Sequence, residues 1–288
     1  MDSFETACEL LPATLRRRIE PFSDRHPEEI RLRLLRPPAL VVKGREQELA
    51  GDKLSENEMN QVLERATGAS LHSAMPGMVN GYISYKGLRI GLCGNAIMNQ
   101  GQLIGFRDFS SLAIRLPREC RGICACFIDR LLQGRLENTL IVSPPGLGKT
   151  TLLRELIRIL ADDGTRVAVL DERNELSASN NGRQHFDLGR CSDVLVGVPK
   201  AVGVGMLLRG LNPQVIAMDE ISAGEDRLVI ERIIGCGVSI LASAHGRDRH
   251  DMLRRPMYRE LFEMGAFGNV ITISRDGENR RYSLERLE

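Results

Sequence analysis

The sequence predicts an α/β fold, in which a mostly parallel sheet is wrapped by helices and follows a smaller α+β domain. From residue 138 onward, short apolar strand-like runs alternate with amphipathic helix-like runs, which is typical of a parallel sheet covered by helices. Residues 81–117 are instead rich in glycine and β-forming residues, which favours a small antiparallel sheet. The pattern changes near residue 120, so we expect one domain over residues 1–119 and a second over residues 120–288.

The N-terminal domain is expected to combine helices with short strands. Residues 4–19 show the apolar spacing of a helix, and residues 29–35, EIRLRLL, alternate apolar with charged side chains as a half-buried strand does. Ser55 is followed three residues later by Glu58, which is the pattern of a capping box at the start of a helix. The glycine-rich segment after that helix supplies the remaining strands.

The C-terminal domain is expected to alternate strands and helices and to end in a hairpin. The strands are predicted at NTLIVS, TRVAVLDE, PQVIAMDE and VSILASAHG. The helices are predicted at ICACFIDRLLQ, KTTLLRELIRILADDG, PKAVGVGMLLRGL, GEDRLVIERIIGCG and HDMLRRPMYRELFEM. Pro256 lies inside the last of these runs and predicts a kink or a boundary there. FGNVITISRD and RRYSLERL are predicted to form the terminal hairpin.

Composition narrows the classes of function. With 39 basic and 38 acidic residues, the net charge is +1, which argues against bulk electrostatic attraction to nucleic acid or to an anionic membrane. No apolar run approaches the roughly 18–20 residues of a membrane span, and no secretory signal is evident at the N-terminus. The seven cysteines are scattered without metal-site spacing, so we expect reduced thiols in a cytoplasmic protein.

Residues 143–151, SPPGLGKTT, indicate a phosphate-binding loop. They lie between a predicted strand and a predicted helix and follow the pattern G-x-x-x-x-G-K with a final threonine, except at the first position. Loop amides and a helix N-terminus would face phosphate oxygens, Lys149 would reach the β- and γ-phosphates, and Thr150 would hold Mg²⁺. The predicted binding residues are Ser143, Pro144, Pro145, Gly146, Leu147, Gly148, Lys149, Thr150 and Thr151.

Ser143 stands where the pattern asks for its first glycine. Serine is small and keeps its amide, and the two prolines that follow rigidify the first half of the loop. We therefore expect at most a modest loss of nucleotide affinity from this departure.

Acidic residues follow two of the predicted strands. In VIAMDE, Asp219 is expected to hold the water shell of Mg²⁺, and Glu220 to orient or deprotonate the attacking water. This pair favours a hydrolysing ATPase over a slow GTPase switch, and no N-K-x-D motif for reading guanine is present. Glu172 and His245 also end strands, where open α/β sheets bind ligands. We expect Glu172 near the metal waters and His245 near the γ-phosphate or Glu220, against a solvated turn and a structural histidine as the alternatives.

Four motifs in this order, SPPGLGKTT, VLDERNE, LLRGLNPQVIAMDE and SAHG, resemble the stage III sporulation protein AA family. That family is related to the hexameric ATPases of type II and type IV secretion and pilus machines. EIRLRLLRPPALV, GYISYKGLRIGLCGNAI and SLAIRLPRE extend the resemblance to nearly the whole chain. It implies a RecA-like P-loop ATPase core that uses ATP and Mg²⁺, and a homo-oligomer, by analogy a hexamer. It also implies work in the mother cell of an endospore-forming bacterium, at the inner face of the membrane through channel proteins.

The resemblance also implies roles for single residues. It assigns Lys149 and Thr150 to Walker A, Asp219 and Glu220 to Walker B, Glu172 to the Asp box, and His245 to the His box. Arg209 matches an arginine that shortly precedes Walker B, although Gln214 replaces the aspartate of that pattern.

Secretion ATPases complete their sites with arginines from the N-terminal domain, and the matching segment here holds Arg89, Arg107 and Arg115. We hypothesise that at least one of them acts in trans or across the domain interface, against solvated surface charges as the alternative.

The leading function is thus an oligomeric Mg²⁺-dependent ATP hydrolase that energises a secretion-like channel between mother cell and forespore. One alternative is a nucleotide-gated scaffold that scarcely hydrolyses. The other is a RecA-type nucleic-acid motor, which would require a basic groove with aromatic side chains that stack on bases. With 4% aromatic residues and no tryptophan, the sequence disfavours a nucleic-acid partner.

Overall fold

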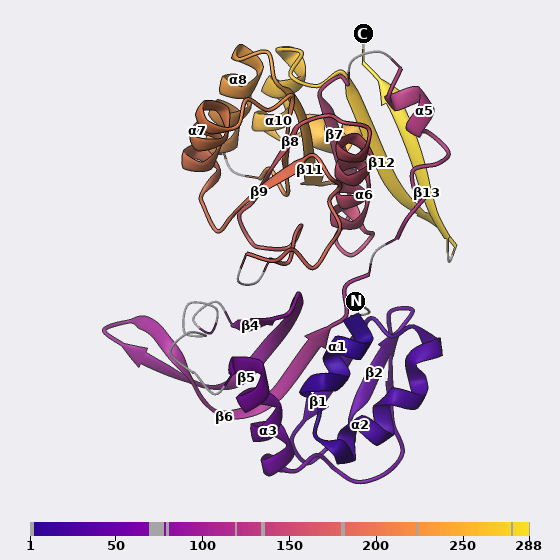
Figure 1. The fold of residues 1–288 in the computed structure, drawn as a ribbon, viewed down its shortest axis with the longest axis vertical. Helices are drawn as coiled ribbons and strands as arrows, with labels where there is room; N and C mark the ends of the chain where they lie inside the picture. Colours follow the sequence, from indigo (N-terminus) through magenta and orange to yellow (C-terminus); the bar gives the residue numbers. More distant parts are fainter. Residues whose placement is uncertain are drawn as a thin grey trace. The chain divides into compact units, whose positions relative to one another are not determined.

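The computed structural model divides the chain into two compact units (Figure 1). The first comprises Met1–Arg118 with Asn180–His185, and the second comprises Glu119–Ser179 with Phe186–Glu288. The structure describes residues 3–68, 78, 81–118, 120–133, 136–179, 182–222, 224–277 and 279–287.

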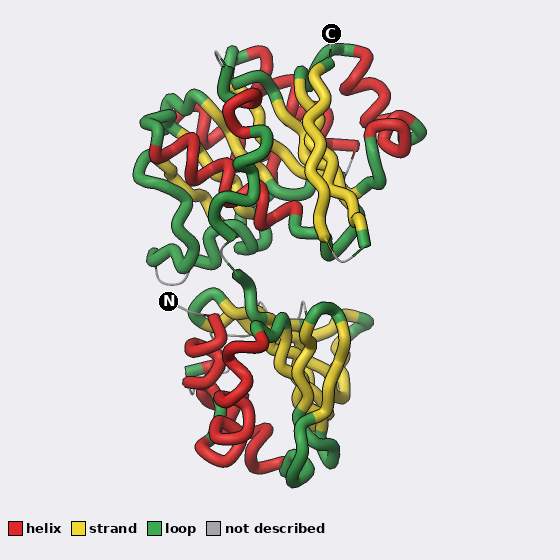
Figure 2. Tube along the Cα trace, turned by 90° about the vertical axis from the view of Figure 1, so that its right-hand side faces the viewer, coloured by secondary structure: helices red, strands yellow, loops and turns green. Residues whose placement is uncertain are grey.

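The first unit is an α+β unit whose helices lie on one face of an antiparallel sheet (Figure 2). The sheet has six strands in the order β3-β2-β1-β6-β5-β4. The strands are β1 (Glu29–Arg33), β2 (Ala39–Val42), β3 (Arg45–Glu48), β4 (Tyr82–Tyr85), β5 (Leu88–Asn99) and β6 (Gln102–Arg115). The helices are α1 (Ser3–Leu10), α2 (Ala13–Ile19), the 3₁₀ helix η1 (Glu20–Arg25) and α3 (Glu56–Thr67).

Local sequence explains the main elements of this unit. In β1, Ile30 and Leu32 are fully buried while the residues between them are partly exposed, as the alternating pattern predicted. The capping box is confirmed, because the Ser55 side chain accepts a hydrogen bond from the Glu58 amide and the Glu58 side chain accepts one from the Ser55 amide. The helix predicted over residues 4–19 is two helices, because Pro12 takes an extended conformation (ψ 156°) before α2 begins.

The second unit contains a seven-stranded sheet in the order β13-β12-β7-β11-β10-β8-β9. Its strands run parallel except for the antiparallel hairpin of β12 and β13. The strands are β7 (Thr139–Ser143), β8 (Val167–Asp171), β9 (Ser192–Val196), β10 (Val215–Met218), β11 (Ser239–His245), β12 (Asn269–Asp276) and β13 (Asn279–Arg286). The helices are α5 (Ile128–Leu131), α6 (Lys149–Asp162), α7 (Lys200–Gly210), α8 (Gly224–Gly235), α9 (Arg249–Leu253) and α10 (Pro256–Glu263).

Helices cover both faces of this sheet. In β7, Ile141 belongs to the hydrophobic cluster that includes the apolar side of α6. Its neighbours Leu140 and Val142 belong to a second cluster with α7, α8 and α10. Since successive side chains of a strand point to opposite faces, β7 is buried on both, as the apolar run NTLIVS predicted.

Three local expectations need correction. The helix predicted over residues 123–133 is reduced to α5, because the Gly122 amide donates to the Glu155 side chain at 2.7 Å and residues 122–127 form tight turns instead. The strand β9 was not predicted, since it pairs only with β8 at the sheet edge and needs no continuous apolar run. The strand β3 was also missed, because all four of its residues are exposed and polar.

The boundary predicted at Pro256 is confirmed, since this residue opens α10 after α9 has ended. Within the described ranges, the structure contains no helix with both the length and the apolar composition that a membrane span requires.

Candidate functional site

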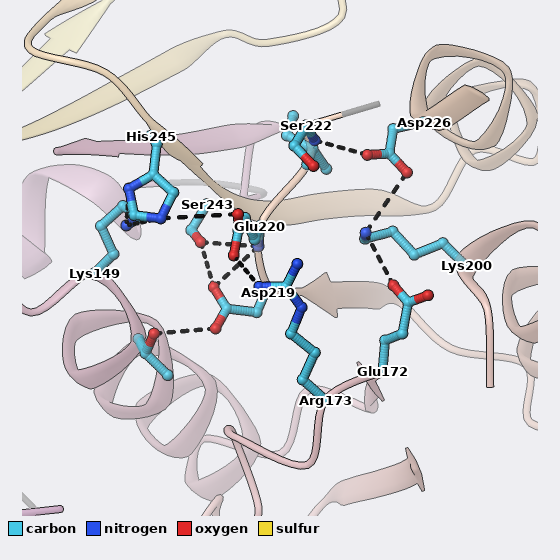
Figure 3. A network of polar contacts seen from close by, with 12 residues as sticks. Lys149, Glu172, Arg173, Lys200, Asp219, Glu220, Ser222, Asp226, Ser243 and His245 are labelled. Atoms are coloured by element: carbon cyan, nitrogen blue, oxygen red, sulfur yellow. Dashed lines mark hydrogen bonds and ion pairs between the residues drawn. The ribbon is translucent and has the colours of Figure 1, made fainter. Parts of the chain in front are cut away.

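The carboxyl ends of three parallel strands bring Lys149, Asp219, Glu220 and His245 together (Figure 3). Lys149 follows β7, Asp219 and Glu220 follow β10, and His245 ends β11. Strand β11 pairs with both β7 and β10, with His245 opposite Ser143. Residues that are far apart in sequence therefore meet at one edge of the sheet, where α/β proteins bind ligands.

The glycine loop has the backbone that an anion cradle needs. Gly146 and Gly148 have φ values of 76° and 96°, in the left-handed region that glycine adopts without strain. α6 begins directly after Gly148, so the N-terminal amides of a 14-residue helix point out of the loop. Loop and helix together offer partial positive charge to phosphate oxygens.

Ser143 fits the loop without disturbing it. Its side chain is fully buried, and its hydroxyl donates a hydrogen bond to the Pro144 carbonyl at 2.9 Å. Its own carbonyl accepts from the Gly246 amide at 3.2 Å, which ties the end of β7 to the end of β11. The serine thus ends the strand as a small, satisfied residue.

Lys149 is a buried cation at the centre of the site, with 7% of its surface exposed. Burial lowers the pKa of the Lys149 ammonium, and the negative charges of Asp219 and Glu220 oppose that shift. Its Nζ lies 3.0 Å from Nδ1 of His245. Since an ammonium only donates hydrogen bonds, Nδ1 accepts here and the proton of a neutral imidazole sits on Nε2. That nitrogen lies 3.8 Å from Oε1 of Glu220, so His245 lies between the lysine and the glutamate.

Asp219 is held in place by hydrogen bonds from three elements. The Thr150 hydroxyl donates to its Oδ2 at 3.0 Å, and the Ser243 hydroxyl and the Glu220 amide both donate to its Oδ1. A threonine hydroxyl beside a carboxylate is the oxygen donor pair that Mg²⁺ prefers when phosphates and water complete its shell. Among the described residues, no group of three or more His, Cys, Asp and Glu could hold a metal. The Thr150–Asp219 pair alone fits a magnesium ion whose remaining ligands are phosphate oxygens and water.

Glu220 leaves the strand with a left-handed backbone, φ 45°, which is uncommon for a residue other than glycine. Its amide also donates to the Ser243 hydroxyl at 3.1 Å, so the turn is fixed from the neighbouring strand. Its carboxylate oxygen Oε2 accepts a hydrogen bond from Arg173 at 2.6 Å. The arrangement presents a partly exposed carboxylate beside Asp219, where it can accept a proton.

Sequence reasoning overlooked two residues of this network. Ser243 lies in the quoted motif SAHG, two positions before His245, which is the spacing that puts both on one face of a strand. Arg173 lies among the acids of LDERNE, and the acids alone drew attention. Both were visible in the motifs, but only the pairing of the strands shows what they contact.

Glu172 belongs to a neighbouring group of charges rather than to the Asp219 cluster. Its Oε2 accepts from Lys200 Nζ at 3.1 Å, and the same ammonium lies 3.6 Å from Asp226. Asp226 in turn accepts from the Ser222 amide at 2.7 Å, just after β10. Asp171, one position before Glu172, accepts the amides of residues 175–177 and shapes the loop.

Arg209 lies away from this edge. It is exposed in the last turn of α7, whereas Lys200 at the first position of the same helix contacts Glu172. Nine residues of helix separate the two by roughly 13 Å along the axis.

The three N-terminal arginines all lie in the first unit. Arg89 and Arg115 are directly opposite each other on β5 and β6. Arg115 lies 3.6 Å from a Glu29 oxygen, and the Arg89 guanidinium stacks 4.0 Å from the centre of the Tyr82 ring. Arg107 is more exposed, with 72% of its side chain accessible.

Comparison with known proteins identifies the family. The sequence model of the family described as Sporulation stage III, protein AA matches residues 1–283. Stage III sporulation protein AA of Bacillus subtilis (strain 168) is 34% identical to the chain over 254 residues, which cover 86% of this chain and 82% of that protein.

Two solved structures share the fold at low identity. The ATPase DotB of Legionella pneumophila is 16% identical with a TM-score of 0.64, and the match covers 96% of this chain and 81% of that one. The pilus retraction motor PilT with bound ADP is 14% identical with a TM-score of 0.64, covering 93% of this chain and 81% of that one. The predicted fold, an α/β unit with a mostly parallel sheet after a smaller α+β unit, is thereby confirmed. The chain belongs to the family described as Sporulation stage III, protein AA.

Proposed function

We propose that this chain is a Mg²⁺-dependent ATPase that works as an oligomeric motor and energises a secretion-like channel between mother cell and forespore. One observation carries the proposal. The strand ends of one sheet place a buried lysine, a threonine–aspartate pair and an adjacent glutamate around a glycine loop. Those residue types in one site supply the phosphate, metal and water positions that nucleotide hydrolysis needs.

Each residue has a role that follows from its contacts. The loop amides and Lys149 would bind the phosphates, and Thr150 and Asp219 would hold a magnesium ion, which would neutralise phosphate charge. Glu220 orients the attacking water and accepts its proton. His245 lies between Lys149 and Glu220, with Nδ1 3.0 Å from the Lys149 ammonium and Nε2 3.8 Å from a Glu220 oxygen, so its ring would link the phosphate-binding cation to the base.

Family membership and structural similarity support the motor part of the proposal. The family belongs to sporulation, and the two fold relatives are described as an ATPase and as a pilus retraction motor. Assembly, by analogy into a hexamer, would let the first unit of one copy bring its arginines to the site of another. Membrane proteins of the channel would then supply attachment at the inner face of the membrane.

One observation favours the nucleotide-gated scaffold as a second candidate. Arg173 occupies Oε2 of Glu220 through a charge-assisted hydrogen bond of 2.6 Å. While Arg173 occupies that oxygen, the attacking water cannot bind to it, so a protein locked in this state would bind ATP and hydrolyse it slowly.

The deciding measurement is phosphate release from the purified protein with Mg-ATP, over a range of protein concentrations, beside Glu220→Gln. We expect specific activity to rise with protein concentration, because shared sites need a neighbour. We expect Glu220→Gln to lower turnover by about 10²- to 10⁴-fold while ATP still binds, because the amide cannot accept the proton.

Lys149→Ala serves as the control that removes ATP binding itself. If the unchanged protein binds ATP but releases no phosphate at any concentration, the scaffold replaces the motor as the better account. If Glu220→Gln turns over as fast as the parent, Glu220 is not the base.

A further inference from the structure

The terminal hairpin of β12 and β13 extends beyond the carboxyl ends of the parallel strands, where the glycine loop lies (Figure 1). β12 pairs in parallel with β7 from Asn269 opposite Thr139 to Thr272 opposite Val142. β7 ends one residue later, but β12 continues to Asp276 before β13 returns. At about 3.3 Å per residue, the hairpin projects roughly 10 Å past the end of β7. The end of β12 therefore runs alongside the start of the loop.

One side chain of this projection reaches the loop. A Cβ atom built on Gly148 would lie 3.1 Å from Nη1 of Arg280, so the guanidinium fills the space beside the last glycine of the loop. Burial raises the pKa of the Tyr282 hydroxyl, while the charge of Arg280 and a hydrogen bond with it oppose that shift. Tyr282 in turn packs against Phe127, with ring centroids 6.3 Å apart. Arg280 is thus directed toward the loop from an anchored strand.

Three positive features lie close together at this place. Gly148 is the N-cap of α6, and the N-terminus of a helix carries partial positive charge that favours anions and disfavours cations. The same turn holds the buried ammonium of Lys149. An anion bound between the loop and the hairpin would lie close to all three positive features and would offset their mutual repulsion.

We propose that Arg280 is a nucleotide-binding residue that contacts the polyphosphate of the bound nucleotide from the hairpin side of the loop. This inference rests on the proposed function, because it needs a nucleotide in the loop of residues 143–151. The planar guanidinium presents paired N–H donors that match two phosphate oxygens, which a lysine ammonium cannot do. The terminal hairpin then forms one wall of the nucleotide site.

Arg281 provides the matched control. It is the next residue on β13, it is also exposed, and it pairs with Ser274 while Arg280 pairs with Arg275. Because neighbouring side chains on a strand point to opposite faces, Arg281→Ala removes the same charge from the same strand without opening the loop side.

The test measures equilibrium binding of fluorescent ATP and ADP analogues to the full chain, with thermal unfolding of every variant as the check on folding. We expect Arg280→Ala to weaken binding of both nucleotides at least about tenfold, the loss of a hydrogen bond to a charged group. Arg280→Lys should recover part of the affinity because it keeps the charge. Arg281→Ala should change affinity less than about twofold.

Three results would overturn the inference. If Arg280→Ala bound nucleotide as tightly as the parent, Arg280 would not contact the polyphosphate. If Arg281→Ala lost as much affinity as Arg280→Ala, the effect would come from the net charge of the hairpin and not from a specific contact. Failure of the unchanged protein to bind nucleotide would overturn it together with the proposed function, so the two failures are distinguishable. If Arg280→Ala does not fold, Arg280→Gln, which can still hydrogen-bond to Tyr282, takes its place with the same expected loss.

Discussion

The two sheets of this chain distribute their polar residues differently. In the parallel sheet of the second unit, Lys149, Asp219 and His245 follow three different strands and meet at one edge. In the antiparallel sheet of the first unit, Glu29, Arg115 and Arg89 form a row across β1, β6 and β5, within the paired strands and at the end of β6. The first arrangement gathers polar residues around the ends of strands, and the second makes a charged row across paired strands.

This difference explains which roles the sequence reveals. All parallel strands end at the same edge, so a polar residue after each apolar run is enough to predict a shared site. Antiparallel strands end at alternate edges, and a long strand exposes every second residue to solvent whether or not it is functional. An arginine in the first unit therefore carries no positional signal of its own.

The prediction with the largest expected effect tests whether the arginines of the first unit take part in catalysis. Combined substitution of Arg89, Arg107 and Arg115 by alanine should lower ATP turnover by about 10³-fold or more if one of them serves as an arginine finger in the assembled protein. ATP binding should change little, because the phosphate loop, Lys149 and Asp219 remain. Phosphate release at high protein concentration and nucleotide binding measured on the same samples separate the two effects.

A matched triple variant removes the same charge from the same unit. Lys43, Arg45 and Lys53 are exposed basic residues, and replacing them by alanine should leave turnover within about twofold of the parent. Turnover that survives the first triple substitution would show that the arginine row on the first sheet takes no part in catalysis. The site would then lie in the second unit alone.

The sequence predicted most residues of the candidate site but not the contacts among them. The glycine loop, Asp219, Glu220 and His245 each follow from a motif and a strand end. The partners of these residues do not, because the Ser243–Asp219 and Arg173–Glu220 contacts depend on which strands are neighbours in the sheet. The position of Glu172 after β8 likewise follows from the sequence, but its contact with Lys200 depends on how α7 packs against that strand.

The second prediction concerns the pH dependence of ATP binding, which should report the titration of the buried Lys149 in the second unit. Burial lowers the pKa of Lys149 below its ordinary value of 10.5. Phosphate binding needs the ammonium, so the dissociation constant for ATP should rise as pH increases through that lowered pKa, by up to tenfold per pH unit. Binding measured from neutral pH to pH 10.5 gives the profile.

Lys149→Arg is the control, because a guanidinium stays protonated throughout this range. Its affinity for ATP is expected to be lower but flat with pH. A flat profile in the unchanged protein would mean that the ammonium keeps its ordinary pKa, and a parallel rise in both proteins would place the titrating group elsewhere.

Buried elements of the fold were easier to predict from the sequence than elements at the edges of the sheets. Buried elements such as β7 and α6 carry an apolar pattern on every turn or residue, so their positions follow from the sequence. Edge elements such as β3 and β9 are held by backbone pairing to a single neighbour and show little apolar signal. The segment before α5 has apolar residues at helical spacing, yet Glu155 binds its backbone at Gly122, which no local pattern reveals.

The smallest expected effect separates stability from function. Ser55→Ala removes the capping box of α3 in the first unit and should cost about 1 kcal/mol of unfolding free energy. Asp248→Ala removes a comparable cap, since the Asp248 side chain accepts a hydrogen bond from the Asp251 amide at the start of α9. That cap lies three residues after His245, so its loss should also weaken ATP binding by a few fold, whereas Ser55→Ala should leave ATP affinity unchanged. Urea unfolding and nucleotide binding of both variants test this, and an equal loss of affinity in the two would mean that the nucleotide site depends on the first unit as much as on the second.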